Sequence, residues 1–137
     1  MREILFRGRS LITHEWIYGD LFQHSEQRFV MAEGRNTEVE PETVGQFTGH
    51  TDKNGKKIFE GDIIKYETPG CSVKYGTINF GKYAINPDNP PLNIGFYISW
   101  LNNPFVRQDL GFWLEHREIV IAGNIQDNLE LIKEDTK

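Results

Sequence analysis

The arrangement of apolar residues constrains the fold more than any other feature of this sequence. They occur in short runs that Gly, Pro, Asn and Asp interrupt along most of the chain. This pattern is typical of strands and turns. Aromatic residues, which favour strands and bury large areas, make up 12% of the sequence and support that interpretation. We therefore expect a mainly β fold, with strands at residues 3–7, 15–22, 28–32, 44–48, 57–66, 75–80, 83–86, 96–101, 112–114 and 117–122.

One tight turn is predicted at Asp52-Lys53-Asn54-Gly55. Asp and Gly stand at the first and last positions of a type I turn, and the Asn-Gly pair also suits a type I′ hairpin. Either turn joins a strand that ends near Thr51 to a strand that begins near Lys57.

A second turn is predicted at Phe80-Gly81-Lys82-Tyr83. Gly at the first central position favours a type II′ hairpin, with Phe80 opposite Tyr83 and Ile78 opposite Ile85. The segment Asn86-Pro87-Asp88-Asn89-Pro90-Pro91 is expected to form a loop, because its prolines lack the N–H donors that a strand ladder needs.

Gly61-Asp62 predicts a structural corner between Phe59 and the next strand. Gly permits φ values that a side chain would forbid, and Asp is expected to accept hydrogen bonds from nearby backbone N–H groups. The strand that follows begins with Ile63-Ile64, two successive apolar residues. Such a strand is either covered on both faces or lies where a sheet curls.

Little helix is expected. Asp127 and Glu130 have the spacing of a capping box, which predicts a short helical turn through Leu129 and Ile132. The predicted fold is therefore mainly β, with additional β-hairpins and one or two short helices.

The length of 137 residues suits one domain, residues 1–137, that buries about two-thirds of its unfolded surface. The net charge of −5 disfavours broad neutralisation of nucleic-acid phosphates. Cys71 is the single cysteine, so no intramolecular disulfide can form and a reducing compartment is indicated. We find no signal peptide and no run of about 18 apolar residues, so we expect a cytoplasmic protein that does not enter membranes.

Several spaced motifs occur in order along the chain. Arg2-Glu3-Ile4-Leu5-Phe6-Arg7-Gly8 and Trp16-Ile17-Tyr18-Gly19 lie near the start, residues 41–49 and 52–64 form the middle, and Gly123-Asn124-Ile125 with Leu129-Glu130-Leu131-Ile132 closes the series. In this order they resemble the YopX family. The resemblance implies a small protein that a phage or prophage encodes in a bacterial host, with an SH3-like barrel component. It implies no activity, substrate or catalytic residue.

Motifs that would carry catalysis or hold a cofactor are missing from the sequence. Its four histidines lack the spacings of zinc sites, such as CxxC or HExxH. Cys71 has no local signal for a neighbouring base or for a helix N-terminus that would lower its pKa. GxSxG, SxxK, Walker A and GxGxxG are all absent. We expect no metal, no cofactor and no enzymatic activity.

One patch is a candidate binding site. Arg2, Arg7 and Arg9 cluster near the N-terminus, and Trp16 and Tyr18 lie on the next predicted strand. Arg7 and Arg9 share a face of an extended strand, so solvated guanidinium groups beside aromatic rings could engage a nucleic-acid strand. The alternative is that these are strand-edge charges beside buried aromatic residues.

Two classes of function follow. The favoured class is a non-enzymatic binding module for a host or phage component, with a protein as partner, because loops and edges of small barrels offer such surfaces. The alternative is a nucleic-acid-associated accessory factor that uses the arginine patch, which the net acidity disfavours. Exposed strand edges leave a homo-oligomer open as well.

Overall fold

The computed structural model describes residues 3–32, 34–67, 69–70, 73–83, 93–101 and 107–133. Within these ranges the chain is mainly β, with one short α-helix and two 3-10 turns, which confirms the predicted fold class. The chain divides into two compact units, residues 1–49 and 50–137. Each is described by itself below, and the assignment of a single domain to residues 1–137 stays a prediction.

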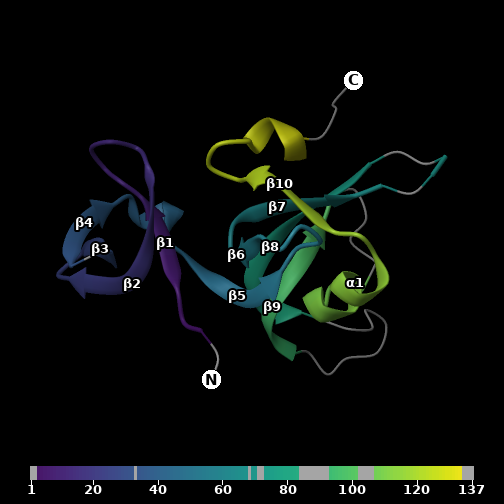
Figure 1. Ribbon diagram of the computed structural model, residues 1–137, viewed down its shortest axis with the longest axis horizontal. Coiled ribbons are helices and arrows are strands. Elements are labelled where there is room, and N and C mark those ends of the chain that lie inside the picture. The colour runs from purple at the N-terminus through teal and green to yellow at the C-terminus, as the bar shows by residue number, and fades with distance from the viewer. Residues whose placement is uncertain are drawn as a thin grey trace. The chain divides into compact units, whose positions relative to one another are not determined.

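The first unit is built on an antiparallel sheet with the strand order β4-β3-β2-β1 (Figure 1). Strand β5 begins beside β1, where Gly45 pairs with Arg7. The elements are β1 (Phe6–Arg9), β2 (Trp16–His24), β3 (Gln27–Ala32), β4 (Arg35–Val39), the 3-10 turn η1 (Pro41–Thr43) and β5 (Gly45–Thr51).

This sheet curls until its first and fourth strands meet. Ser10, which follows β1, forms an isolated antiparallel bridge with Val39 at the end of β4. Two hydrogen bonds accompany the bridge: Leu11 N–H donates to the Glu38 carbonyl, and Glu40 N–H donates to the Arg9 carbonyl, both over 3.0 Å. The structure shows contact at this corner but establishes no closed barrel, so the SH3-like barrel stays a prediction.

The inner side of the curled sheet needs a glycine at position 8. Val30 and Val39 are fully buried there, 0% and 1% exposed. A Cβ on Gly8 would lie 2.7 Å from Cγ2 of Val39, closer than two carbon atoms can approach. The absence of a side chain at Gly8 therefore lets β1 and β4 come together.

The second unit contains an antiparallel sheet with the strand order β10-β7-β8-β9. Its elements are β6 (Lys57–Phe59), β7 (Asp62–Tyr66), β8 (Lys74–Tyr83), β9 (Asn93–Trp100), helix α1 (Leu110–His116), β10 (Val120–Asn124) and the 3-10 turn η2 (Leu129–Ile132).

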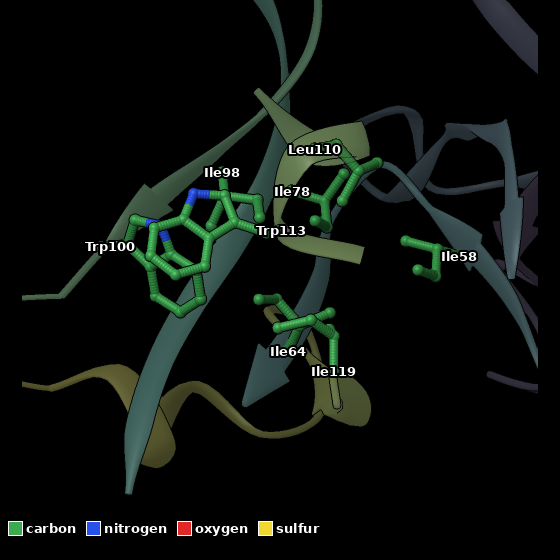
Figure 2. Packing of buried hydrophobic residues seen from close by; sticks show 8 residues of the cluster. All are labelled: Ile58, Ile64, Ile78, Ile98, Trp100, Leu110, Trp113 and Ile119. Carbon is green, nitrogen blue, oxygen red and sulfur yellow. The ribbon is translucent and has the colours of Figure 1, made fainter. Parts of the chain in front are cut away.

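Helix α1 supplies Leu110 and Trp113 to the core of this unit (Figure 2). The ring of Trp113 meets the ring of Trp100 edge-on, with 4.9 Å between centroids, and its Nε1 donates to the Arg107 carbonyl over 2.6 Å. Arg107 in turn donates from Nη2 to Asp109 Oδ2 over 2.9 Å, and this hydrogen bond raises the pKa of the guanidinium. The remaining buried members of the cluster are Ile58, Ile64, Ile78, Ile98 and Ile119.

The predicted turn at residues 52–55 is confirmed. Gly55 has φ of +83°, and its N–H donates to the Asp52 carbonyl over 3.0 Å. The Asp52 side chain is buried and accepts three backbone hydrogen bonds, from Asn54 and Lys56 within the turn and from Ile121 on β10. One carboxylate therefore holds the β5–β6 turn against the edge of the sheet.

The predicted corner at Gly61-Asp62 is also confirmed. Gly61 has φ of +92°, and Asp62 Oδ2 accepts a hydrogen bond from Phe59 N–H over 2.8 Å. Ile63 and Ile64 are both 0% exposed, so this strand is covered on both faces, as one of the two predictions stated.

The helical turn near the C-terminus is confirmed, but the capping box is wrong. Asn128 is the N-cap of η2 and its side chain does not cap it. Asn128 Oδ1 instead accepts from Asn124 N–H, and Asp127 accepts from the Asn124 side-chain amide. The hydrogen bonds of Asn124 to Asp127 and Asn128 therefore hold the turn before η2.

The predicted II′ hairpin at residues 80–83 is wrong. Strand β8 continues through the segment, with Phe80 opposite Phe96 and Tyr83 opposite Asn93. The ladder between β8 and β9 gains ring contact between Phe80 and Phe96, at 5.1 Å between centroids, which a hairpin at Gly81 would forfeit. The proposed partner Ile85, the rest of the strand predicted at 83–86 and the loop at 86–91 lie outside the described residues.

The strand predicted at 112–114 is wrong as well, because these residues belong to α1. Leu110 and Trp113, three residues apart, share the buried face of that helix. The sequence analysis also missed β4, whose segment Arg-Asn-Thr-Glu-Val carries a single buried residue, Val39.

The close approach at Gly8 gives a direct test of the curled sheet. We expect Gly8→Ala to lower the free energy of unfolding by about 1–3 kcal/mol, because the added methyl group overpacks a buried contact. Gly111→Ala in α1 is the matched control: a Cβ there meets nothing within 4 Å, and alanine favours a helix by about 0.5–1 kcal/mol. Urea unfolding of both variants is the measurement, and equal losses would contradict the contact between β1 and β4.

Candidate interaction surface

Strand β2 alternates between two environments. Its odd-numbered residues Ile17, Gly19 and Leu21 are partly buried, whereas Tyr18, Asp20 and Phe22 are exposed. Side chains two residues apart on a strand share a face, and residues opposite one another on paired strands share that face too. We call the exposed side the aromatic face; it comprises Trp16, Tyr18, Asp20, Phe22 and His24 from β2, Phe29 from β3 and Glu38 from β4.

The rings on this face pack beside one another and still reach solvent. Phe22 lies opposite Phe29, with 6.0 Å between ring centroids, and its ring stacks parallel to His24 at 6.4 Å. Tyr18 is 47% exposed and Phe22 is 44% exposed. Single exposed apolar residues are ordinary, but several aromatic rings on one sheet face are typical of an interaction site.

Arg7 lies beside the aromatic face, on the same side of the sheet as Tyr18. It lies opposite Tyr18 in the β1–β2 ladder, and its guanidinium carbon is 4.8 Å from the centroid of the Trp16 ring. The residue is only 5% exposed. A planar guanidinium stacks well on an indole ring, so Arg7 orients Trp16 while its own charge is withdrawn from the surface.

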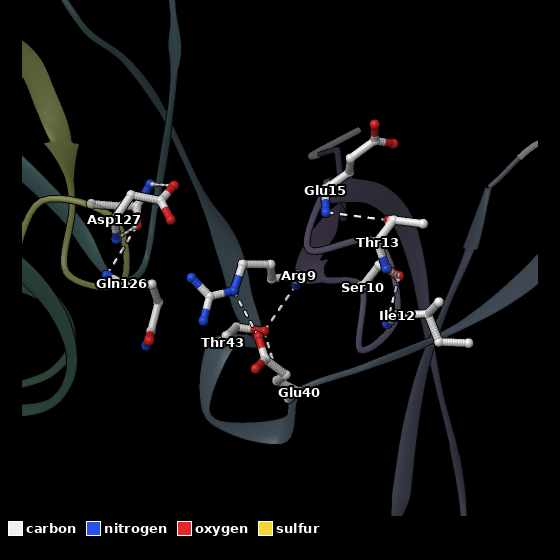
Figure 3. Close-up of polar contacts among 10 residues, drawn as sticks. Arg9, Ser10, Ile12, Thr13, Glu15, Glu40, Thr43, Gln126 and Asp127 are labelled. Atoms are coloured by element: carbon white, nitrogen blue, oxygen red, sulfur yellow. Dashed lines mark hydrogen bonds and ion pairs between the residues drawn. The ribbon is translucent and has the colours of Figure 1, made fainter.

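Arg9 is held by the turn that follows β4 (Figure 3). Its Nε donates to Glu40 Oε2 over 2.6 Å, and both side chains are about one-fifth exposed. Its backbone N–H donates to Thr43 Oγ1 over 2.9 Å, while the Thr43 hydroxyl donates to the Glu40 carbonyl over 2.6 Å. The charge of Arg9 is therefore balanced by Glu40, and the pair fastens β1 to η1.

The structure brings four of the five predicted site residues together but changes their roles. Arg7, Arg9, Trp16 and Tyr18 are neighbours on β1 and β2, and Arg2 lies outside the described residues. The assumption that the guanidinium groups of Arg7 and Arg9 are solvated is wrong, since one is buried and the other is paired.

Five residues of this surface were missed: Asp20, Phe22, His24, Phe29 and Glu38. The alternation of aromatic residues along 16–22 was the available signal, and it was followed only as far as Tyr18. The two carboxylates, on Asp20 and Glu38, form no ion pair or hydrogen bond with the described part of the chain. The aromatic face is therefore acidic and apolar rather than basic.

A groove of about 600 Å³ in the second unit is a further candidate. It lies between the end of α1, the Asp52 turn and the end of β7. Its polar groups are largely engaged: Asp52 accepts backbone hydrogen bonds, and Lys53 Nζ lies 3.0 Å from Glu118 Oε2. Residues of both charges line it, and among the described lining residues no nucleophile is hydrogen-bonded to a base, as catalysis would need.

Two further features concern only the described ranges. Within them, no three His, Cys, Asp or Glu side chains gather to form a metal site, and Cys71 lies outside them. No helix found there has the length and hydropathy needed to cross a membrane.

Comparison with protein families gives a match. The model of a family described as YopX protein matches residues 5–133, nearly the whole chain. No curated protein matches the sequence.

The burial of Arg7 can be tested by mutation, which distinguishes a guanidinium buried on the Trp16 ring from a solvated one. We expect Arg7→Gln to lower the free energy of unfolding by about 1–3 kcal/mol, because a buried side chain loses its contact with the Trp16 ring. Arg35→Gln, an exposed residue on β4, should change it by less than about 0.5 kcal/mol. Chemical denaturation measures both, and an unaltered midpoint for Arg7→Gln would mean that its guanidinium is solvated.

Proposed function

The chain belongs to the YopX family, and we propose that it is a non-enzymatic binding module that holds a protein partner on the aromatic face of its first unit. In this proposal it is an accessory protein that a phage or prophage encodes and that acts on a host or phage component. The exposure of Tyr18 and Phe22 on one sheet face is the observation that carries the proposal.

The energetics favour a protein as partner. Phe and Tyr rings bury large areas, and tyrosine and tryptophan are enriched among the residues that dominate binding energy. Covering the exposed parts of Tyr18 and Phe22 would contribute about 25 cal/mol for each Å² of apolar surface removed from water. The rings are already oriented, Trp16 by Arg7 and Phe22 by Phe29, so binding would cost little side-chain entropy.

A nucleic-acid partner is the second candidate, since exposed rings along a strand can stack on bases. Phosphate contact requires accessible cations, however. Arg7 is buried, Arg9 is paired with Glu40, and the face itself carries Asp20 and Glu38. These charges weigh against the nucleic-acid proposal.

Photo-crosslinking in the cells in which the gene naturally occurs tests the proposed function. We expect p-benzoylphenylalanine in place of Phe22 to give adducts several-fold stronger than the same residue in place of Phe80, a phenylalanine on β8 of the second unit that is more exposed than Phe22. The adducts should be sensitive to protease and resistant to nuclease. An adduct of twice the chain's mass would identify a second copy as the protein partner.

Three outcomes would contradict the proposed function. Equal adduct yields at positions 22 and 80 would mean that the partner does not bind the aromatic face in preference to another exposed surface. Adducts sensitive to nuclease would favour the nucleic-acid candidate. The lack of any adduct at position 22 would remove the aromatic face as a binding surface.

A further inference from the structure

The chemistry of the aromatic face also indicates what occupies it. We propose that the occupant is an extended, proline-rich protein segment that carries at least one arginine or lysine. This inference rests on the proposed function and adds the class of ligand to it.

In this proposal the side chains of β2 hold the ligand, and its backbone does not. Each residue of β2 pairs along one edge only, residues 16–19 with β1 and residues 20–24 with β3. A segment that binds as an added strand needs a free edge, whereas this ligand meets a face. Because Tyr18 and Phe22 are exposed on that face, the ligand is held by contacts with side chains, above all with aromatic rings.

A polyproline II segment fits such a surface best. Its pyrrolidine rings are rigid apolar plates that pack on aromatic rings, and the preformed helix loses little entropy on binding. Tyr18 and Phe22 are four residues apart, which is about 13 Å along a strand. Four residues of polyproline II rise about 12 Å, so one short segment can cover both rings.

The charges on the face select a cation. Asp20 stands between Tyr18 and Phe22 on the same side of β2, and Glu38 lies opposite Phe29. Neither carboxylate is paired within the described chain, while Arg7, which lies opposite Tyr18, is buried. A basic residue close to the prolines could pair with Asp20 and stack on a neighbouring ring, whereas a phosphate backbone would meet like charge.

The probe is a synthetic octapeptide of prolines with two internal arginines. Matched peptides replace either both arginines with glutamate or all prolines with serine, and oligothymidylate represents nucleic acid. Titration of the labelled full-length chain is followed by two-dimensional NMR. The indole N–H of Trp16 reports on the face, and those of Trp100 and Trp113, buried in the second unit, serve as internal references.

We expect the arginine–proline peptide to cause saturable shifts at the Trp16 indole and at the amides of Tyr18, Asp20 and Phe22. The glutamate peptide should bind at least about fivefold more weakly than the arginine–proline peptide, because the carboxylates of the face repel its charge and the cation–π contact is lost. The serine peptide, which lacks the rigid rings, should also bind at least fivefold more weakly.

Variants locate the contacts. Phe22→Ser should remove the shifts, and Asp20→Asn should weaken the arginine–proline peptide about threefold without weakening the glutamate peptide. Phe80→Ser, an exposed phenylalanine outside the face, should bind as the parent chain does. Dispersed spectra of each variant verify that it is folded.

The inference would be overturned by no saturable shift at about 1 mM arginine–proline peptide, by equal binding of all three peptides, or by tighter binding of oligothymidylate. If the peptide fails while photo-adducts at position 22 remain, the binding module stands and only the ligand class is wrong. If both fail, the proposed function fails with it.

Discussion

The pairing register of β2 is the constraint on which the surface of the first unit depends. Its first half pairs with β1 and its second half with β3, so one alternation of side chains runs through both ladders. This register places Arg7 beside Tyr18, Phe22 beside Phe29, and Leu21 beside the fully buried Val30. A slip of one residue would turn every side chain to the other face and bring Tyr18 and Phe22 inside the curled sheet. The aromatic face and the inner apolar side are two consequences of one pairing.

The binding proposal follows from where this register leaves the charges. The guanidinium of Arg7 stacks on the Trp16 ring, and that of Arg9 is paired with Glu40. Neither arginine therefore adds positive charge to the surface. What remains outside is a set of rings with Asp20 and Glu38 among them. Two of the arginines that suggest nucleic-acid binding in the sequence therefore have structural roles: Arg7 orients Trp16, and Arg9 fastens β1 to η1.

The sequence predicted those features that short segments determine. The turn at Asp52–Gly55 and the corner at Gly61-Asp62 follow from local backbone chemistry, and both are found. The hairpin at Phe80 and the strand at 112–114 failed because long-range pairing decided them: β9 extended β8 past Gly81, and packing of Trp113 on Trp100 favoured a helix. For the candidate site, the sequence predicted that Trp16 and Tyr18 lie on the strand next to Arg7 and Arg9, and the register agrees, while their role in binding stays a prediction. The burial of Arg7 was not, because it depends on a neighbouring strand that the sequence does not specify.

Side-chain contacts across β2 in solution test the register most directly. Nuclear Overhauser measurements on the full-length chain should show contacts between Arg7 and Tyr18 and between the rings of Phe22 and Phe29. They should also show Leu21 against Val30 on the opposite face. Contacts of Leu21 with Phe29, or of Ile17 with Arg7, would mean that the strand is shifted by one residue, and the aromatic face described here would not exist.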